Sequence, residues 1–322
     1  MDLDRIKTTD GLDLAGKRVL VRADLNVPVA DGRVTDDTRL ARLAPGLEDF
    51  ARRGARIVVM SHFGRPKGKA APEFSLKPVA EALGRVVKAP VTFAGESVGA
   101  AAEAAVANLK PGGILVLENL RFHPGEEKND AAFAAALARL GDIFVEDAFS
   151  SAHRAHASTE AITHLLPSYA GPLLMEEINA LRTVLEKPRR PTAALVGGAK
   201  VSTKIPVLSN LLPKVDKLIV GGGMANTFLQ AQGTNVGKSL CEPDFNAQAK
   251  EILASAKAAG CEIILPEDAV VAKEFKAGAD HKVVPVSRVP ADSMILDAGP
   301  ASVARINAVL AVFPPEVEVL RK

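Results

Sequence analysis

The sequence predicts an α/β protein of two domains, each built on a parallel β-sheet. Short apolar runs rich in β-branched residues alternate with longer segments rich in Ala, Leu, Lys, Arg and Glu, and this alternation occurs in both halves of the chain. The 322 residues are enough for two domains of about 100–200 residues each. Hydrophobic residues make up 48% of the chain and charged residues 24%, as in ordinary globular proteins.

The first half contains five expected strands with helical segments between them. A strand, helix, strand order predicts parallel strands with helices covering both faces of the sheet. The expected strands are 18–22, 56–60, 91–93, 114–117 and 143–145, and the main expected helices are 38–52, 76–86 and 131–140.

The second half repeats the pattern, so we expect two Rossmann-like domains joined by a helix. The joining helix is expected at 174–186, because the Lys-Pro-Arg-Arg-Pro run at 187–191 interrupts helices. We therefore predict domains at 1–172 and 189–322 with the interdomain helix at 173–188. The expected strands of the second half are 192–196, 217–220, 262–265 and 282–284, and a helix is expected at 247–259.

Charge and composition exclude several classes of protein. The 40 basic and 38 acidic residues give a net charge of +2, which argues against a general binder of nucleic acids or membrane surfaces. The N-terminus lacks the apolar core of a signal peptide, and no apolar run approaches the length of a membrane span, so we expect a cytoplasmic protein. Cys241 and Cys261 lack metal-ligand spacing, and we expect both to be reduced thiols.

Polar and basic residues follow the expected strands of the first half, where α/β sheets bind ligands. Arg22, Asp24 and Asn26 alternate with apolar residues and share one side of the first strand. Each arginine alone is more often a solvated surface residue, and the strand end could simply emerge into solvent. Together, they predict a site for a small anion, since guanidinium groups bind carboxylate and phosphate bidentately. The remaining members of this group of polar and basic residues are Arg39, His62, Arg65, Arg121 and Arg154.

Two glycine runs follow expected strands of the second half. Residues 197–204 read as a glycine turn that opens a helix, with Lys200 and Lys204 on one helical face. Residues 221–223 are three further glycines. Neither run fits the Walker pattern, and taken alone such turns are usually tight connections between a strand and a helix. Phosphate binding is the alternative that they allow.

Together these runs resemble phosphoglycerate kinase over about residues 1–307. Several long motifs in the right order make this resemblance specific. Small departures, such as Glu146 in place of the expected asparagine and Ser150 in place of glycine, do not disturb it. The motifs are VRADLNVP (21–28), MSHFGRP (60–66), LENLRFHPGEE (117–127), EDAFSSAHRAH (146–156), GGAKVSTK (197–204), GGGMANTFL (221–229), LPEDAVVAKEF (265–275) and MILDAGPASVARIN (294–307).

The resemblance implies reversible phosphoryl transfer between ATP and 3-phosphoglycerate, which gives 1,3-bisphosphoglycerate in glycolysis, with Mg²⁺ as cofactor of ATP or ADP. It implies a monomer, whereas the absence of a nucleic-acid or membrane partner is expected from the charge balance. Arg39 and Lys204 would be catalytic, neutralising the transferred phosphoryl group. On the nucleotide side would lie Gly198, Lys200, Lys204 and Gly223. Residues that would hold 3-phosphoglycerate are Asp24, Asn26, Arg39, His62, Arg65, Arg121 and Arg154.

The end of the sequence departs from the family. We expect a Trp-Asn-Gly-Pro motif and a Gly-Gly-Asp-Thr phosphate loop, whose aspartate would serve magnesium, yet neither is present and the chain has no tryptophan. The second domain is therefore expected to be incomplete and to have an open apolar sheet edge, with no metal ligand of its own. A truncated, frameshifted or incompletely predicted product is favoured over a natural short form.

Three functions remain open for such a chain. They are an active kinase, an inactive fragment that at most binds 3-phosphoglycerate, and a poorly folded product. A dinucleotide-binding oxidoreductase is disfavoured, since no Gly-x-Gly-x-x-Gly run opens a helix.

Overall fold

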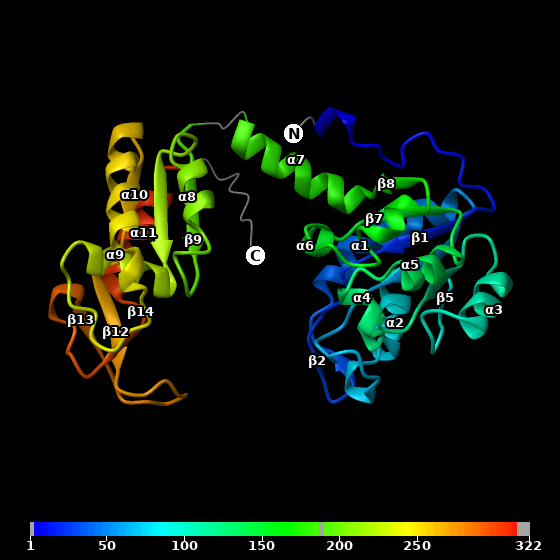
Figure 1. The fold of residues 1–322 in the computed structure, drawn as a ribbon, viewed down its shortest axis with the longest axis horizontal. Helices are drawn as coiled ribbons and strands as arrows, with labels where there is room; N and C mark the ends of the chain where they lie inside the picture. Colours follow the sequence, from blue (N-terminus) through cyan, green and yellow to red (C-terminus); the bar gives the residue numbers. More distant parts are fainter. Residues whose placement is uncertain (1–2, 187–189, 314–322) are drawn as a thin grey trace. The chain divides into compact units, whose positions relative to one another are not determined.

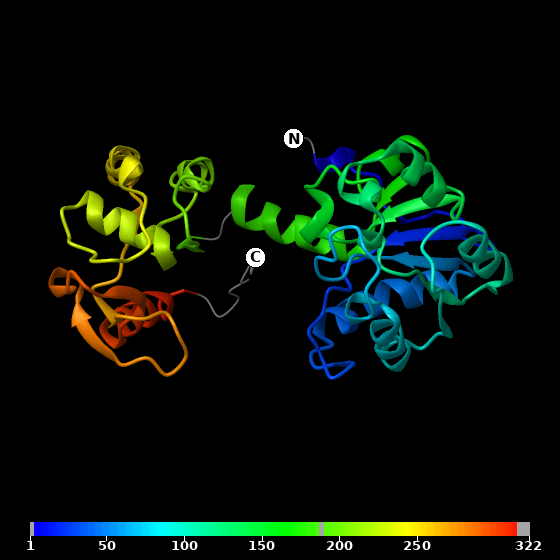
Figure 2. The ribbon, with the colours of Figure 1, turned by 60° about the horizontal axis from the view of Figure 1, so that its bottom comes forward.

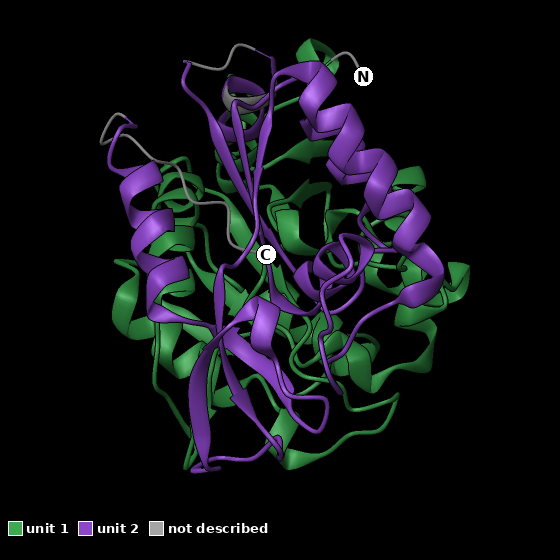
Figure 3. Ribbon diagram, turned by 90° about the vertical axis from the view of Figure 1, so that its left-hand side faces the viewer, with its two compact units in different colours: residues 1–179, 322 green, residues 180–321 purple. Residues whose placement is uncertain are grey.

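The computed structural model describes residues 3–186 and 190–313, which form two compact units (Figure 1; Figure 3). The first unit ends at Asn179 and the second begins at Ala180. This division falls inside the helix α7 (Pro172–Glu186), where a joining helix was expected. No helix in the described residues is long and apolar enough to cross a membrane.

The first unit is built on a six-stranded sheet in the order β5-β6-β4-β1-β7-β8. All neighbouring pairs are parallel, as the sequence predicted. β8 was not expected. The strands are β1 (Arg18–Arg22), β4 (Arg56–Met60), β5 (Val91–Phe93), β6 (Ile114–Val116), β7 (Ile143–Glu146) and β8 (Ser168–Ala170).

Helices cover both faces of this sheet. The α-helices are α1 (Thr38–Arg52), α2 (Lys77–Val86), α3 (Ala100–Asn108), α4 (Pro124–Glu127), α5 (Ala131–Ala138) and α6 (Phe149–Ala152). Four short 3₁₀ helices lie at Leu3–Arg5, Pro72–Phe74, Leu120–Phe122 and Ala161–His164, and a small hairpin pairs β2 (Val29–Ala30) with β3 (Arg33–Val34).

Alternating side chains of each strand enter two different cores. On β1, Val19 and Val21 pack with α1 and α2, whereas Leu20 packs on the opposite face with α3 and α5. A strand that is buried on both faces reads as a continuous apolar run, which is why these strands could be located from the sequence.

The second unit contains a three-stranded parallel sheet in the order β11-β10-β9. Figure 2 shows the helices α8 and α10 side by side over it, and with α9 and β10 they enclose one hydrophobic core. β9 is an edge strand among the described residues, and its Leu195 is 65% exposed. The elements are β9 (Ala193–Gly197), α8 (Ile205–Leu211), β10 (Lys217–Gly221), α9 (Gly222–Ala231), α10 (Asn246–Ala259) and β11 (Glu262–Ile264).

A second sheet of this unit is antiparallel, in the order β13-β12-β14. The expectation that 282–284 belongs to a parallel sheet was therefore wrong. The segment does form a strand, but only eight residues separate β13 from β12, too few for the helical crossover that a parallel pair needs. These elements are β12 (Asp268–Ala272), β13 (His281–Pro285), β14 (Met294–Ala298) and α11 (Pro300–Leu310), with 3₁₀ helices at Pro243–Phe245 and Val286–Arg288.

Candidate functional site

The candidate site lies where the carboxyl ends of β1, β4, β6 and β7 meet in the first unit. The chain continues from these strands into the segments that carry the polar and basic residues singled out from the sequence. Because adjacent parallel strands end at the same edge of a sheet, these segments lie close together. The buried apolar Ala23, Leu25 and Val27 anchor the segment that follows β1 in the core.

Arg22 is the buried centre of this group, with 1% of its surface exposed. Its Nε donates to Ser158 Oγ (2.9 Å) and its Nη1 to the carbonyl oxygen of Ala23 (2.6 Å). Its Nη2 lies 3.1 Å from His62 Nδ1. Arg22 was noted for its position on the first strand but was not among the predicted substrate residues, because its burial cannot be read from a strand end.

His62 is an uncharged neighbour of Arg22. Burial, together with the positive charges of Arg22 and Arg121, lowers the pKa of His62 to about 3. The imidazole is therefore neutral at physiological pH. Since Arg22 donates to Nδ1, the ring proton lies on Nε2, where it can be donated to an anion.

Asp24 organises a second part of the site. Its Oδ2 accepts from Arg39 Nη1 (2.5 Å) and from Ser150 Oγ (2.6 Å), and its Oδ1 accepts from the backbone N–H of Asn26 (3.0 Å). Burial alone would raise the pKa of Asp24, but the hydrogen bonds from Ser150 and Asn26 and the charge of Arg39 bring it below its ordinary value. Asp24 therefore stays ionised and restrains the exposed Arg39.

Asn26 ties the first-strand segment to the loop after β4. Its Oδ1 accepts from the backbone N–H of Gly64 (2.9 Å). Gly64 has a positive φ of 58°, and a Cβ there would meet the ring of Phe74 at 2.5 Å, so this position requires glycine.

Asn119, which belongs to the LENLRFHPGEE motif but was not among the predicted site residues, fixes the next loop. It is fully buried, accepts from the backbone N–H groups of Phe63 (3.1 Å) and Arg121 (3.0 Å), and donates to the carbonyl oxygens of Phe63 (2.7 Å) and Phe74 (2.9 Å). A satisfied buried amide of this kind makes a loop rigid.

Arg121 is 7% exposed, and its Nη1 donates to the carbonyl oxygen of Gly64 (2.9 Å). Its Nε lies 3.2 Å from Glu127 Oε1, an ion pair without hydrogen-bond geometry. Arg154 is exposed, yet close enough for its charge to lower the pKa of both His62 and Arg121.

The structure thus brings together most of the predicted substrate residues. Arg65 is exposed on the loop after β4, and among the described residues no hydrogen bond or ion pair joins its side chain to the others. We call Arg22, Asp24, Arg39, His62, Arg121 and Arg154 the basic cluster.

In the second unit, the glycine runs pack against each other. A Cβ on Gly222 would lie 2.9 Å from the carbonyl oxygen of Gly198, and one on Gly223 would lie 2.9 Å from that of Ala199. The backbone N–H of Met224 donates to the same Gly198 oxygen (2.9 Å). These glycines therefore permit a close approach between the loop after β9 and the first turn of α9.

The prediction that Lys200 and Lys204 share a helical face was wrong. α8 begins only at Ile205, and residues 201–204 form turns. Ser202 donates hydrogen bonds to Glu242 from both its backbone N–H (2.9 Å) and its hydroxyl (2.7 Å). These bonds stabilise the turn that precedes the helix. Lys200 is exposed and Lys204 is half-buried.

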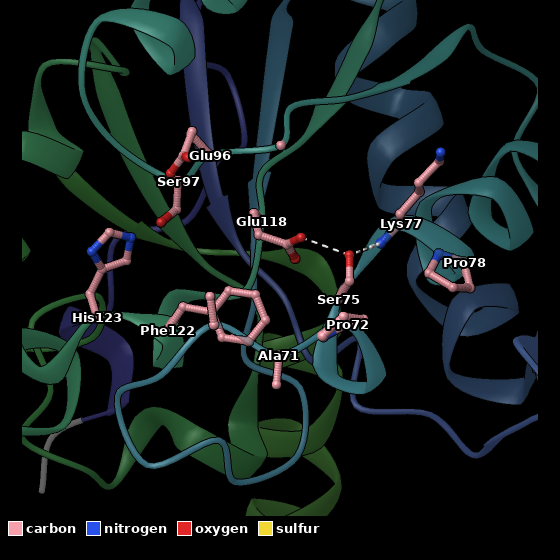
Figure 4. Close-up of a pocket in the computed structure, with 12 residues that line it drawn as sticks. Ala71, Pro72, Ser75, Lys77, Pro78, Glu96, Ser97, Glu118, Phe122 and His123 are labelled. Carbon is pink, nitrogen blue, oxygen red and sulfur yellow. Dashed lines mark hydrogen bonds between the residues drawn. The ribbon is translucent and has the colours of Figure 1, made fainter.

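A separate hollow of about 640 Å³ lies at the carboxyl ends of β5 and β6. Figure 4 shows Lys77 and Ser97 on opposite sides of it, with Ser75 donating to Glu118 (2.7 Å). None of the predicted site residues lines this hollow, and it is not part of the basic cluster.

Both cysteines are free, as expected. Within residues 3–186 and 190–313, no group of three or more His, Cys, Asp or Glu side chains is placed to hold a metal ion.

Comparison with known proteins gives a consistent result. A family model described as phosphoglycerate kinase matches residues 9–313. A phosphoglycerate kinase of Ruegeria sp. (strain TM1040) is 60% identical over 305 residues, which are 95% of this chain and 77% of the relative. One from Methylobacterium radiotolerans is 60% identical over 301 residues, which are 94% of this chain and 75% of the relative.

Solved structures agree with the sequence relatives. The phosphoglycerate kinase of Coxiella burnetii matches with a TM-score of 0.74 at 41% identity, over 95% of this chain and 77% of that chain. That of Pyrococcus horikoshii OT3 matches with a TM-score of 0.80 at 26% identity, over 95% of this chain and 78% of that chain.

Proposed function

Because this chain belongs to the phosphoglycerate kinase family, we propose that it serves reversible phosphoryl transfer between ATP and 3-phosphoglycerate, a reaction of glycolysis. The observation that carries the proposal is the basic cluster at the carboxyl edge of the first sheet. 3-Phosphoglycerate bears a carboxylate and a phosphate, and the guanidinium groups of Arg39, Arg121 and Arg154 suit both.

The proposed substrate residues have different tasks. Asp24 and Asn26 bear oxygens that are already used to hold Arg39 and the Gly64 loop, so their geometry favours positioning over direct contact with a phosphate. His62, neutral and protonated at Nε2, is placed to donate one hydrogen bond. Arg65 completes the set as an exposed cation on the same loop as His62.

The chemistry requires no general base. A carboxylate oxygen of 3-phosphoglycerate, ionised at neutral pH, attacks the γ-phosphorus of ATP. The bond from that phosphorus to the bridging oxygen breaks, ADP leaves with the electron pair, and 1,3-bisphosphoglycerate forms. Catalysis then consists of positioning and of neutralising charge on the transferred group, which we assign to Arg39 and Lys204.

The second unit is proposed to carry the nucleotide. Gly198, Lys200 and Lys204 lie in the loop after β9, and Gly223 lies in the first turn of α9 after β10, at the carboxyl edge where such sheets bind ligands. Mg²⁺ would be bound together with ATP or ADP. The described residues do not fit a protein cage for it, and we assign it no protein ligand.

We propose the domain limits expected from the sequence, with 3-phosphoglycerate bound within 1–172, the linking helix at 173–188 and the nucleotide within 189–322. A cytoplasmic monomer belongs to the same proposal, and light scattering at several concentrations tests the monomeric state.

A second candidate function is binding of 3-phosphoglycerate without turnover. The 322 residues contain no Trp-Asn-Gly-Pro or Gly-Gly-Asp-Thr run, and the resemblance implies that the second of these motifs is a phosphate loop with a magnesium ligand. This observation favours the binding function for the 322-residue polypeptide tested by itself.

One preparation of the 322-residue protein separates the candidates. Titration calorimetry with 3-phosphoglycerate should show binding, and Arg121→Ala should weaken it at least tenfold through loss of a charge-assisted contact. ADP formation from magnesium ATP is then measured with Arg39→Ala and Lys204→Ala as controls against host enzyme. ADP that depends on 3-phosphoglycerate and is lost in both variants supports the kinase. Binding without ADP supports the second candidate, and a folded protein that binds nothing contradicts both.

A further inference from the structure

Glu146 ends β7 directly beside the buried centre of the basic cluster. Its Cα pairs in register with Arg22 of β1 on one side and with Ala170 of β8 on the other. Its Oε1 accepts from the backbone N–H of Ala148 (2.9 Å). Its Oε2 is shielded from solvent and has no hydrogen-bond partner. A buried carboxyl oxygen without a partner is uncommon and calls for an explanation.

Three charged groups act on this carboxyl. Arg22 of β1 favours the ionised form of Glu146, whereas the adjacent Asp147 and Glu126 of α4 oppose it. Burial is the largest influence, and it raises the pKa of Glu146 to about 8. Glu146 is therefore mostly uncharged at neutral pH and loses its proton just above it.

Arg22 is the group that would respond to this ionisation. The three guanidinium nitrogens of Arg22 are hydrogen-bonded to Ser158, the Ala23 carbonyl and His62. Glu146 therefore acts on Arg22 through charge and not through a hydrogen bond. Glu126 reaches Arg22 through Ser158 Oγ, which donates to Glu126 Oε1 (2.6 Å). With Glu146 neutral, the positive charge of Arg22 adds to that of Arg121 and Arg154 at the site. With Glu146 ionised, a buried negative charge offsets it.

We propose that Glu146 makes the anion site pH-dependent: the site binds 3-phosphoglycerate tightly while Glu146 is protonated and weakly once Glu146 ionises. This inference rests on the proposed function of the basic cluster. Linkage makes the effect reciprocal, since a ligand that prefers the protonated form must raise proton affinity at Glu146 on binding.

The test is calorimetric titration of 3-phosphoglycerate into the 322-residue protein between pH 7.0 and 9.5. The phosphate of the ligand, with a second pKa of about 6, is already ionised throughout this range. Asp147, whose pKa burial raises to about 6, is ionised there as well, and His62 is neutral. The affinity for 3-phosphoglycerate should fall about tenfold as the pH rises across this range. A fall of that size corresponds to ligand binding that raises the pKa of Glu146 by about one unit.

Glu146→Gln keeps the shape of the side chain, but the glutamine cannot ionise. The affinity of this variant for 3-phosphoglycerate should therefore stay near the pH 7.0 value of the wild type at every pH tested. Glu103→Gln, an exposed carboxyl that pairs with Arg139 on the surface, should keep the slope of the wild type. Equal slopes in wild type and Glu146→Gln would overturn the inference and leave the proposed function intact. Absence of binding at every pH by the folded wild type would instead reject the proposed function.

A second measurement needs no variant. Binding heats at pH 8 are compared in buffers of different ionisation enthalpy, which reports proton exchange with the buffer. Uptake of a fraction of a proton on binding is expected, since 3-phosphoglycerate draws Glu146 into its protonated form. Zero uptake, or release of protons, would contradict the inference even if Glu146→Gln fails to fold.

Discussion

Arg22 is a buried cation, and the residues that stabilise its charge lie far from it in the sequence. Ser158, 136 residues away, accepts from Arg22 Nε and donates to Glu126, which is itself completely buried. The Ser158 backbone N–H also donates to Glu126 (3.1 Å). A buried cation and a buried carboxyl are thus joined through one hydroxyl, an arrangement that is stable only when each member keeps its partner.

Replacing Ser158 by alanine should remove both bonds of that hydroxyl. We expect a loss of about 2 kcal/mol in the free energy of unfolding, since one buried donor and one buried acceptor lose their partner. Urea unfolding measures it. Thr163→Ala is the matched control, because that hydroxyl is exposed and bonds only to the nearby Glu160 carbonyl (2.7 Å). Equal destabilisation by the two variants would show that Ser158 does not support Arg22.

His62 should remain uncharged over the whole physiological range. Its pKa is lowered, so its contribution to stability is complete above the unfolded value of 6.5 and is lost as the pH falls from there toward about 3. Nitrogen-15 NMR at pH 7 and pH 5 should show the same neutral tautomer, protonated at Nε2. A chemical-shift change centred near pH 6.5 would contradict this prediction.

At the scale of elements, both units begin a helix with the same device. Asp147 accepts from the backbone N–H of Leu174 (2.9 Å) at the start of α7, and Asp268 accepts from those of Ala301 (3.0 Å) and Ser302 (2.8 Å) at the start of α11. A carboxylate at this end of a helix satisfies free N–H groups and complements the helix dipole. In each case a glycine precedes the helix, and a Cβ at that position would clash with the carboxyl group.

Gly171→Ala should destabilise the first unit. A Cβ at this position would lie 2.4 Å from the carboxyl group of Asp147, so the cap or the helix has to move. We expect a cost of about 1–3 kcal/mol, typical of overpacking at a well-packed site. Thermal unfolding followed by circular dichroism measures it.

Gly95→Ala is the control for this variant, because its Cβ would meet nothing within 4 Å. Its melting temperature should equal that of the wild type. If Gly171→Ala melts at that temperature too, the close contact with Asp147 does not restrict the position.

Sequence reasoning was more successful for buried strands than for the other elements. β1, β4 and β5 match their expected ranges, because continuous apolar runs mark strands covered on both faces. β12 and β14 were missed, and β13 was assigned to the wrong kind of sheet. Their partners are chosen by turn length and by tertiary packing, for which the local sequence carries a weaker signal.

At the scale of the whole molecule, each unit encloses its own hydrophobic core. The first unit buries residues on both faces of its sheet, and the second encloses a core between α8, α9, α10 and β10. A unit with its own core is expected to fold by itself.

A fragment of residues 1–186 should therefore unfold in one cooperative transition and bind 3-phosphoglycerate with the affinity of the 322-residue protein. Circular dichroism and calorimetry measure both properties. The same fragment carrying Arg121→Ala is the control, and it should fold but bind weakly. A fragment that does not fold would show that the first unit depends on residues beyond 186.

The residue pattern alone was enough to predict the α/β class, the positions of the main strands of the first sheet, the family and the gathering of basic residues at one edge of that sheet. This was possible because strand periodicity, strand ends and motif order can all be identified from the local sequence. Tertiary packing was needed to show that Arg22 is buried, that Ser158 and Glu126 hold it, that Glu146 has an oxygen without a partner, and that Lys200 and Lys204 precede their helix. These properties depend on desolvation and on contacts between residues far apart in the chain. The local sequence pattern predicts neither of them.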